Sequence, residues 1–211
     1  GEVPLYLGYC GNGQYTRAGD DWENTGVPFP QDGRWHTLLL VSSQEHGEAV
    51  LYLDGIRATS RKRAIRNPSG AECRIGRQYG AHEEYFTGRI FEVAVYERAL
   101  EEAEAKSYAP GNLAGRELGL HALVQFDSSG KVADRISGTL GNAINCGVAD
   151  GPTISPPVPT TPRALQLGGS SAHVVFNRPL VPSSGSFSIA VTFLAGAITG
   201  WAAELLSQDG E

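Results

Sequence analysis

The Asp54-Gly55 dipeptide is the feature that most constrains how this chain folds. Both central positions of a type I′ hairpin turn need positive φ, which aspartate and glycine tolerate well. The dipeptide separates an apolar run at residues 48–53 from residues 56–59, and another apolar run at residues 35–41 precedes both. These segments therefore predict an antiparallel meander of strands.

Short apolar runs separated by turn residues continue along the rest of the chain. This pattern predicts further strands at residues 89–96, 120–126, 164–167, 173–176 and 187–193. Residues 98–106 are predicted to be helical, because their acidic residues come early and Lys106 comes late, as the helix dipole favours. Residues 147–163 carry five of the 12 prolines and predict a long surface loop.

Length and charge exclude several classes of protein. A chain of 211 residues is long enough for one large all-β sandwich whose core needs no disulfide. No apolar stretch approaches the roughly 20 residues of a membrane span, so no membrane insertion is expected. The net charge of −6 argues against binding to nucleic acid or to an anionic membrane surface.

The three cysteines, Cys10, Cys73 and Cys146, are too scattered to predict a specific chemistry. No two of them form a Cys-x-x-Cys arrangement, so neither a zinc site nor a thioredoxin-like redox site is expected. Either one disulfide with a free thiol or three small core thiols would satisfy the sequence.

Four short strings follow one another between residues 27 and 108, and together they carry a family resemblance. They lie at residues 32–37 (Asp-Gly-Arg-Trp-His-Thr), 51–55 (Leu-Tyr-Leu-Asp-Gly), 75–76 (Ile-Gly) and 86–100. In this order they resemble the C-terminal half of a laminin G-like or pentraxin-like domain of the concanavalin A-like lectin/glucanase superfamily. The last string, a strand followed by Arg98-Ala99-Leu100, is the most specific of the four.

Residues 120–211 resemble the N-terminal half of the same domain, so the two halves stand in reverse order. The matching strings lie at residues 123–127, 133–134, 138–140, 164–169, 185–191 and 204–207. Either a circular permutant that folds as one sandwich or a window across two tandem modules would produce this order. Because the total length fits one module, we expect a single sandwich over residues 1–211, with residues 109–119 as the connector between the halves.

The resemblance implies an all-β fold, a concanavalin A-like jelly-roll sandwich of two antiparallel sheets with one short helix near residues 98–108. It also implies a non-catalytic recognition module within a larger, extracellular or cell-surface protein. Carbohydrate binding of a lectin type, or cell adhesion, is the leading function, and a structural protein–protein interaction module without a glycan ligand is the alternative. A glycan-degrading enzyme of the same fold is a remote third possibility.

An enzyme is not expected, because the carboxylates that glycoside hydrolysis needs are not paired in the sequence. Retaining glycosidases hold two carboxylates roughly 5 Å apart. Asp20-Asp21 and Glu83-Glu84 are adjacent along the chain, so on a strand the members of each pair would point to opposite faces.

The candidate ligand-binding residues are aromatic, acidic and basic side chains in loops. Sugar rings stack on exposed aromatic rings while acidic neighbours accept their hydroxyl groups, and guanidinium groups bind sulfated or carboxylated glycans. The candidates are Tyr15, Trp22, Asp20, Asp21, Tyr79, Tyr85, Arg61, Lys62 and Arg63. The alternatives are a solvated basic hairpin and aromatic rings that fill the rim of the core. Trp35 is expected in the core, and His36 is expected to be structural.

No cofactor is expected, although many relatives hold calcium at the rim of the sandwich. The family's carboxylate positions are occupied here by Gly168, Phe91, Ser171 and Ala172. The carboxylates of Asp127, Asp134 and Glu92 offer another possible set of ligands, with solvated or capping carboxylates as the alternative.

Overall fold

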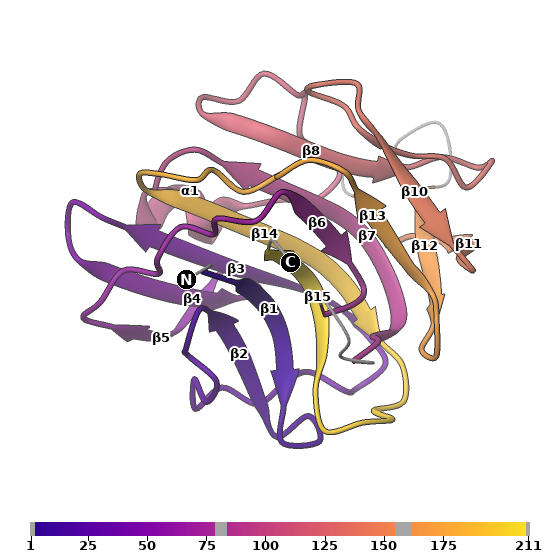
Figure 1. Ribbon diagram of the computed structural model, residues 1–211, viewed down its shortest axis with the longest axis horizontal. Coiled ribbons are helices and arrows are strands. Elements are labelled where there is room, and N and C mark those ends of the chain that lie inside the picture. Colours follow the sequence, from indigo (N-terminus) through magenta and orange to yellow (C-terminus); the bar gives the residue numbers. More distant parts are fainter. Residues whose placement is uncertain (1–2, 79–83, 155–161, 210–211) are drawn as a thin grey trace.

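Two antiparallel sheets pack face to face in the computed structural model, which describes residues 3–78, 84–154 and 162–209 (Figure 1). The first sheet has the spatial order β2 (Tyr15–Gly19), β1 (Leu5–Cys10), β15 (Ala203–Asp209), β6 (Glu72–Ile75), β13 (His173–Phe176) and β10 (Leu140–Ile144). The second has the order β9 (Val132–Asp134), β8 (Leu120–Phe126), β7 (Thr87–Tyr96), β14 (Phe187–Ala195), β3 (Trp35–Ser43), β4 (Glu48–Leu53) and β5 (Ile56–Arg61). The strand β12 (Arg163–Gly168) pairs with β7, and β11 (Gly147–Asp150) pairs with β12. The strands β10 and β9 also pair, which joins the two sheets along one edge. The expected all-β sandwich is confirmed.

The core lies between the sheets, because alternate side chains of each strand point inward. Leu5, Leu7 and Tyr9 of β1 are inward-facing and almost completely buried. The aromatic rings of Phe29 and Phe193 stack at the centre with their centroids 5.0 Å apart. Close packing of such large apolar groups supplies most of the stabilisation of a sandwich of this size.

Strands from both ends of the chain lie side by side in each sheet. In the first sheet β15 pairs with β1 in antiparallel register, with Leu5 opposite Gln208. In the second sheet β14 lies between β7 and β3. The boundaries of the two resembling halves and their reversed order remain a prediction.

Part of the outer face of the second sheet is covered by the helix α1 (Glu102–Ser107). Ala105 of α1 packs with Leu39, Ala94 and Tyr96. The helix begins at residue 102 rather than at the predicted residue 98. The hydroxyl group of Ser188 on β14 accepts the Leu100 amide and donates to the Arg98 carbonyl, which holds this stretch against the sheet.

Of three further local predictions, the structure confirms the turn and differs on the loop and on Trp35. The Asp54-Gly55 turn is confirmed, with φ values of 52° and 75°. Residues 147–163 are not entirely a loop as predicted, because β11 occupies Gly147–Asp150 and pairs with β12. Trp35 is only half-buried, and it packs on Phe91 at the outer face of the second sheet instead of in the main core.

All three cysteines are free thiols. Cys10 and Cys73 are buried and Cys146 is partly buried. Of the two possibilities that the sequence leaves open, the structure has the three small thiols.

Candidate functional site

The predicted ligand-binding residues do not form one site. Asp20, Asp21 and Trp22 lie at the end of β2, close to a basic run along and after β5, whereas Tyr85 lies at a rim of the sandwich. The basic run consists of Arg57, Arg61, Lys62, Arg63 and Arg66. Tyr79 lies outside the described residues.

Acidic and basic side chains neutralise one another where β2 and β5 end, in what we call the ion cluster: Asp20, Asp21, Arg61, Arg63 and Arg66. Arg61 donates to Asp21 Oδ1 at 2.6 Å and to Asp20 Oδ1 at 3.2 Å. Arg63 also pairs with Asp21, and Arg66 pairs with Asp20. Asp20 is only 8% exposed, so it is a buried counter-ion and does not face a ligand.

The local fold explains why these distant segments meet. Gly19 ends β2 with φ of 75°, which turns the chain into Asp20. A side chain at position 19 would clash with Ile65, since an added Cβ would lie 2.4 Å from Ile65 Cδ1. The glycine therefore lets the segment after β5 approach the end of β2 closely.

The remaining members of the basic run are also paired. Arg57 and Lys62 both contact Glu48 Oε1, at 2.9 and 3.4 Å. The Arg61 guanidinium lies 5.2 Å from the centroid of the Trp22 ring, so one face of that ring is covered. A sulfated or carboxylated glycan would have to compete with these carboxylates for the guanidinium groups.

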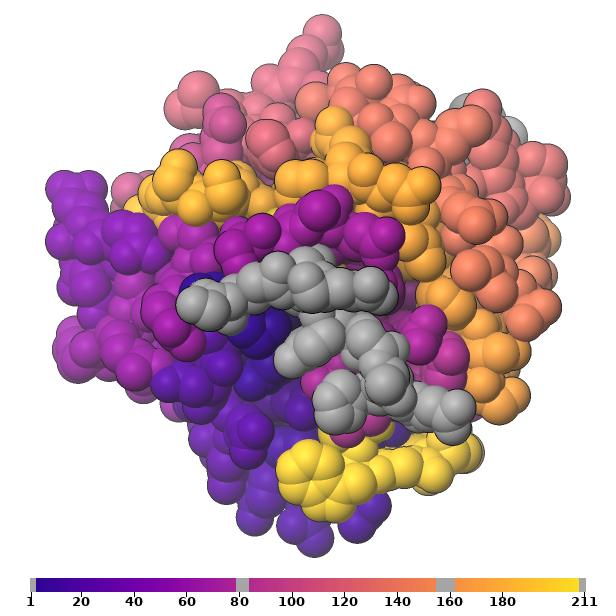
Figure 2. All heavy atoms as spheres, in the orientation of Figure 1, coloured from indigo at the N-terminus to yellow at the C-terminus, as the bar shows by residue number. Residues whose placement is uncertain are grey.

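A second group of residues surrounds a cavity of about 250 Å³ at one rim of the sandwich, which we call the rim pocket. Loops from separate parts of the chain converge here, and the lining residues are Tyr85, Gly168, Gly169, Ser170, Thr199, Gly200 and Ala202. None of these lining residues carries a charged side chain. In Figure 2 the β14–β15 connection, in yellow, lies at the lower edge of the face, next to the indigo N-terminal strands.

The rim pocket offers a ligand one aromatic ring, two side-chain hydroxyl groups and the exposed peptide groups of glycine residues. Gly169 has φ of 94°, and an added Cβ there would lie 2.5 Å from Thr87 Oγ1, so the loop needs glycine at this position. Gly168 and Gly200 leave their backbone open to an approaching ligand. Hydroxyl groups and peptide groups exchange hydrogen bonds with sugar hydroxyls, while the ring offers an apolar surface.

The Tyr85 ring packs against the side chains of Arg77 and His173. The Arg77 guanidinium lies 5.1 Å from its centroid, and the His173 ring lies 5.8 Å away. Burial lowers the pKa of His173, and the positive charges of Arg77 and Arg74 lower it further. A neutral His173 therefore packs beside Tyr85 at neutral pH.

A further aromatic residue, Trp201, stands between the lining residues Gly200 and Ala202 along the chain. Trp201 is 56% exposed, and its carbonyl accepts the Asn12 amide at 2.9 Å. The predicted ligand-binding residue Tyr15 is half-buried at the start of β2 and lies beside Gly11, and it is not among the residues that line the rim pocket. Sequence reasoning missed Trp201, although a tryptophan directly after Thr199-Gly200 in a loop was a usable signal.

The sequence also gave no sign of a buried ion pair on the outer side of the first sheet. Arg17 of β2 pairs with Glu204 of β15 and donates to Glu84 Oε2 at 2.7 Å. Both Arg17 and Glu204 are buried, and Gln78 accepts a longer bond at 3.3 Å. The members come from segments far apart along the chain, so their adjacency could not be inferred from spacing.

The carboxylates considered for calcium accept hydrogen bonds from the protein. Asp134 accepts the amides of Leu123 and Ile136 and pairs with Arg178 at 3.0 Å. Asp127 caps a turn through the Ser129 amide. Among the described residues no three histidine, cysteine or acidic side chains are grouped as metal ligands would be. The expectation that the chain needs no calcium stays a prediction.

Glu92 is buried on the outer face of the second sheet. Burial raises the pKa of this carboxyl, although donors from Gln125, Tyr108 and the Gly111 amide partly offset that effect. These bonds tie the segment after α1 to the sheet, which gives Glu92 a structural role.

His36 is clamped between two aspartates. Its Nδ1 lies 2.7 Å from Asp54 Oδ2 and its Nε2 lies 2.8 Å from Asp32 Oδ1. Burial alone would lower the pKa of His36, but hydrogen bonds to both carboxylates outweigh burial and raise it. The clamp joins the start of β3 to the β4–β5 turn, as expected for a structural histidine.

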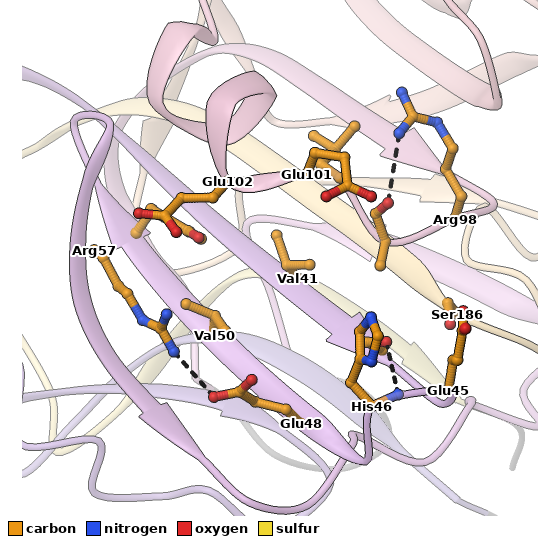
Figure 3. Close-up of a pocket in the computed structure, with 14 residues that line it drawn as sticks. Val41, Glu45, His46, Glu48, Val50, Arg57, Arg98, Glu101, Glu102 and Ser186 are labelled. Atoms are coloured by element: carbon orange, nitrogen blue, oxygen red, sulfur yellow. Dashed lines mark hydrogen bonds and ion pairs between the residues drawn. The ribbon is translucent and has the colours of Figure 1, made fainter.

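A further cavity, of about 360 Å³, lies between the β3–β4 hairpin and the segment that leads into α1 (Figure 3). We call it the α1 pocket. Val41, Val50 and Leu100 form an apolar floor, and the acidic side chains at its edge include Glu45 and Glu101.

Comparison with known proteins supports the fold. Residues 6–106 match the family model of the concanavalin A-like lectin/glucanases superfamily, which confirms the resemblance over those residues. No curated protein matches the chain.

The family match supports a carbohydrate-binding or adhesion-type module in general. Laminin G-like domains are usually non-catalytic and commonly extracellular, although the superfamily includes glycosidases. Within the described part of the chain, no helix has the length and apolar character to cross a membrane.

Proposed function

We propose that this chain binds an uncharged glycan in the rim pocket. The observation that supports the proposal is the position of the Tyr85 ring beside the Ser170 and Thr199 hydroxyls and the bare backbone of Gly168 and Gly200. A sugar presents an apolar face of C–H groups and an edge of hydroxyl groups, so it needs a ring and hydrogen-bonding groups close together.

The charge distribution favours a neutral ligand over an anionic one. The described residues that line the rim pocket are uncharged, whereas the guanidinium groups of the ion cluster already hold carboxylates. A neutral sugar at the rim requires no displacement of an existing ion pair.

A glycan array tests the proposal, with three proteins compared on the same slides. The unmodified chain should give a series of related neutral oligosaccharides, and Tyr85→Ala should lose them. Trp22→Ala is the matched aromatic control, because Trp22 lies against Arg61 of the ion cluster, and it should keep the whole series. The reverse result, with Trp22→Ala blank and Tyr85→Ala active, would move the site to the ion cluster, and a blank array for the unmodified chain would refute glycan binding.

A steric variant separates loss of binding from loss of structure. No atom lies within 4 Å of a Cβ added at Gly168, and its φ is outside the left-handed region, so Gly168→Val should fold normally while filling the pocket. Gly147→Val is the control, because an added Cβ there makes only ordinary contacts with Gln166. Gly168→Val should bind at least about tenfold more weakly than Gly147→Val.

A further inference from the structure

The α1 pocket is a second cavity, separate from the rim pocket. Figure 3 shows Val41 and Val50 between two sets of acidic side chains, with Glu101 and Glu102 on one side and Glu48 on the other. Its volume of about 360 Å³ is within the range of ligand pockets in proteins.

The positive charges at the edge of the α1 pocket are already engaged. Arg98 donates to both carboxylate oxygens of Glu104, at 2.7 and 2.5 Å, and Arg57 donates to Glu48 at 2.9 Å. Neither guanidinium is available to an anionic ligand without breaking an ion pair.

An acidic group at the edge is, by contrast, left without a partner. Glu102 pairs with Lys106, and Glu101 accepts the Glu104 amide at the start of the helix. In the described part of the chain the exposed Glu45 carboxylate makes no hydrogen bond or ion pair. The pocket therefore combines an apolar floor with an excess of negative charge.

We propose that the α1 pocket binds a lysine or arginine side chain presented by a peptide segment of a protein partner. Such a side chain buries its alkyl stem on apolar surface while its charged end stays at a polar edge. The stem would lie over Val41 and Val50, and the cation would pair with Glu45. The net charge of −6 also attracts a basic segment at long range.

An immobilised array of random pentapeptides tests this interaction with the unmodified chain as the probe. Bound peptides should be enriched in lysine or arginine next to an apolar residue. Glu45→Lys should weaken their signal about tenfold, because the new ammonium group replaces the attraction by repulsion. Glu23→Lys makes the same change of charge at another exposed position and should keep the signal.

Three outcomes would overturn the proposal. They are an array without enrichment of basic residues, an enrichment that Glu45→Lys retains, and an equal loss in Glu45→Lys and Glu23→Lys, which would show attraction by net charge alone. Gly168→Val, which blocks the rim pocket, should leave the peptide signal unchanged. A failure of glycan binding is therefore distinguishable from a failure of this interaction.

Discussion

Replacement of His36 by glutamine should destabilise the fold more at pH 6 than at pH 9. In the structure both ring nitrogens contact carboxylates, at 2.7 and 2.8 Å, which requires a protonated ring with two donors. Glutamine can keep a neutral hydrogen bond to one aspartate but not the charge. The substitution therefore removes a charge-assisted interaction and leaves the rest of the strand intact.

The size of the expected loss in unfolding free energy depends on how exposed the two aspartate partners of His36 are. The side chains of Asp32 and Asp54 are 38% and 45% exposed, so solvent screens them and each interaction is worth less than a buried one. We expect His36→Gln to lower the free energy of unfolding at pH 6 by about 1–2 kcal/mol. For a chain of this length that corresponds to a fall of roughly 2–8 °C in melting temperature.

The pH dependence has a definite sign. The folded-state pKa of His36 is raised above the ordinary value of 6.5, so the protonated ring stabilises the fold fully below about pH 6.5. That contribution is lost as the pH rises through the folded-state pKa. The difference in melting temperature between the two proteins should therefore shrink between pH 6 and pH 9.

Thermal melts followed by circular dichroism at pH 6, 7, 8 and 9 measure this difference. His46→Gln is the matched control, because His46 is exposed on a turn and its ring has no carboxylate partner among the described residues. Its melting temperature should stay close to that of the unmodified chain at every pH. A His36→Gln difference that is constant from pH 6 to pH 9, or that grows, would refute a charged clamp.

Further predictions concern metal, anionic glycans and chain order. Millimolar calcium should not raise the melting temperature, because Gly168 and Phe91 replace the family's carboxylates; a rise of several degrees that a chelator reverses would contradict this. Because the guanidinium groups of the ion cluster already hold carboxylates, the unmodified chain should pass through a sulfated-polysaccharide column at low salt; retention that alanine at Arg61, Lys62 and Arg63 abolishes would contradict this. A rearranged chain that starts at residue 112, joins residue 211 to residue 1 and ends at residue 111 should fold and melt within about 5 °C of the original, because Leu5 pairs with Gln208; an unfolded product would count against one permuted sandwich.

The local sequence pattern was sufficient to predict many of the strands and turns of the sandwich. The turn at Asp54-Gly55 and the strands around it depend on neighbouring residues alone, so the sequence predicts them well. The first turn of α1 was misplaced because the Ser188 hydroxyl, from a distant strand, donates to the Arg98 carbonyl, which a helix starting at residue 98 would use as an acceptor for the residue 102 amide. The strand β11 was missed because its pairing with β12 is not visible in the composition of a proline-rich segment.

The candidate site was less accessible to sequence reasoning. Tyr85 was identified as an exposed aromatic residue, but the loops that complete the rim pocket converge only in three dimensions. The basic run was identified as unusual, and the acidic pair at Asp20 and Asp21 was noted separately. Their mutual neutralisation depends on contacts across about forty residues of sequence, which spacing alone does not reveal.

Amide chemical-shift mapping with a mixture of uncharged oligosaccharides tests the central claim most directly. Nitrogen-15 spectra of the unmodified chain report the site of contact without any substitution. Glycan binding in the rim pocket predicts saturable shifts confined to the amides of Tyr85, residues 168–170 and residues 199–202. Shifts centred on residues 20–22 and 61–66, or no shifts at millimolar oligosaccharide, would contradict the account.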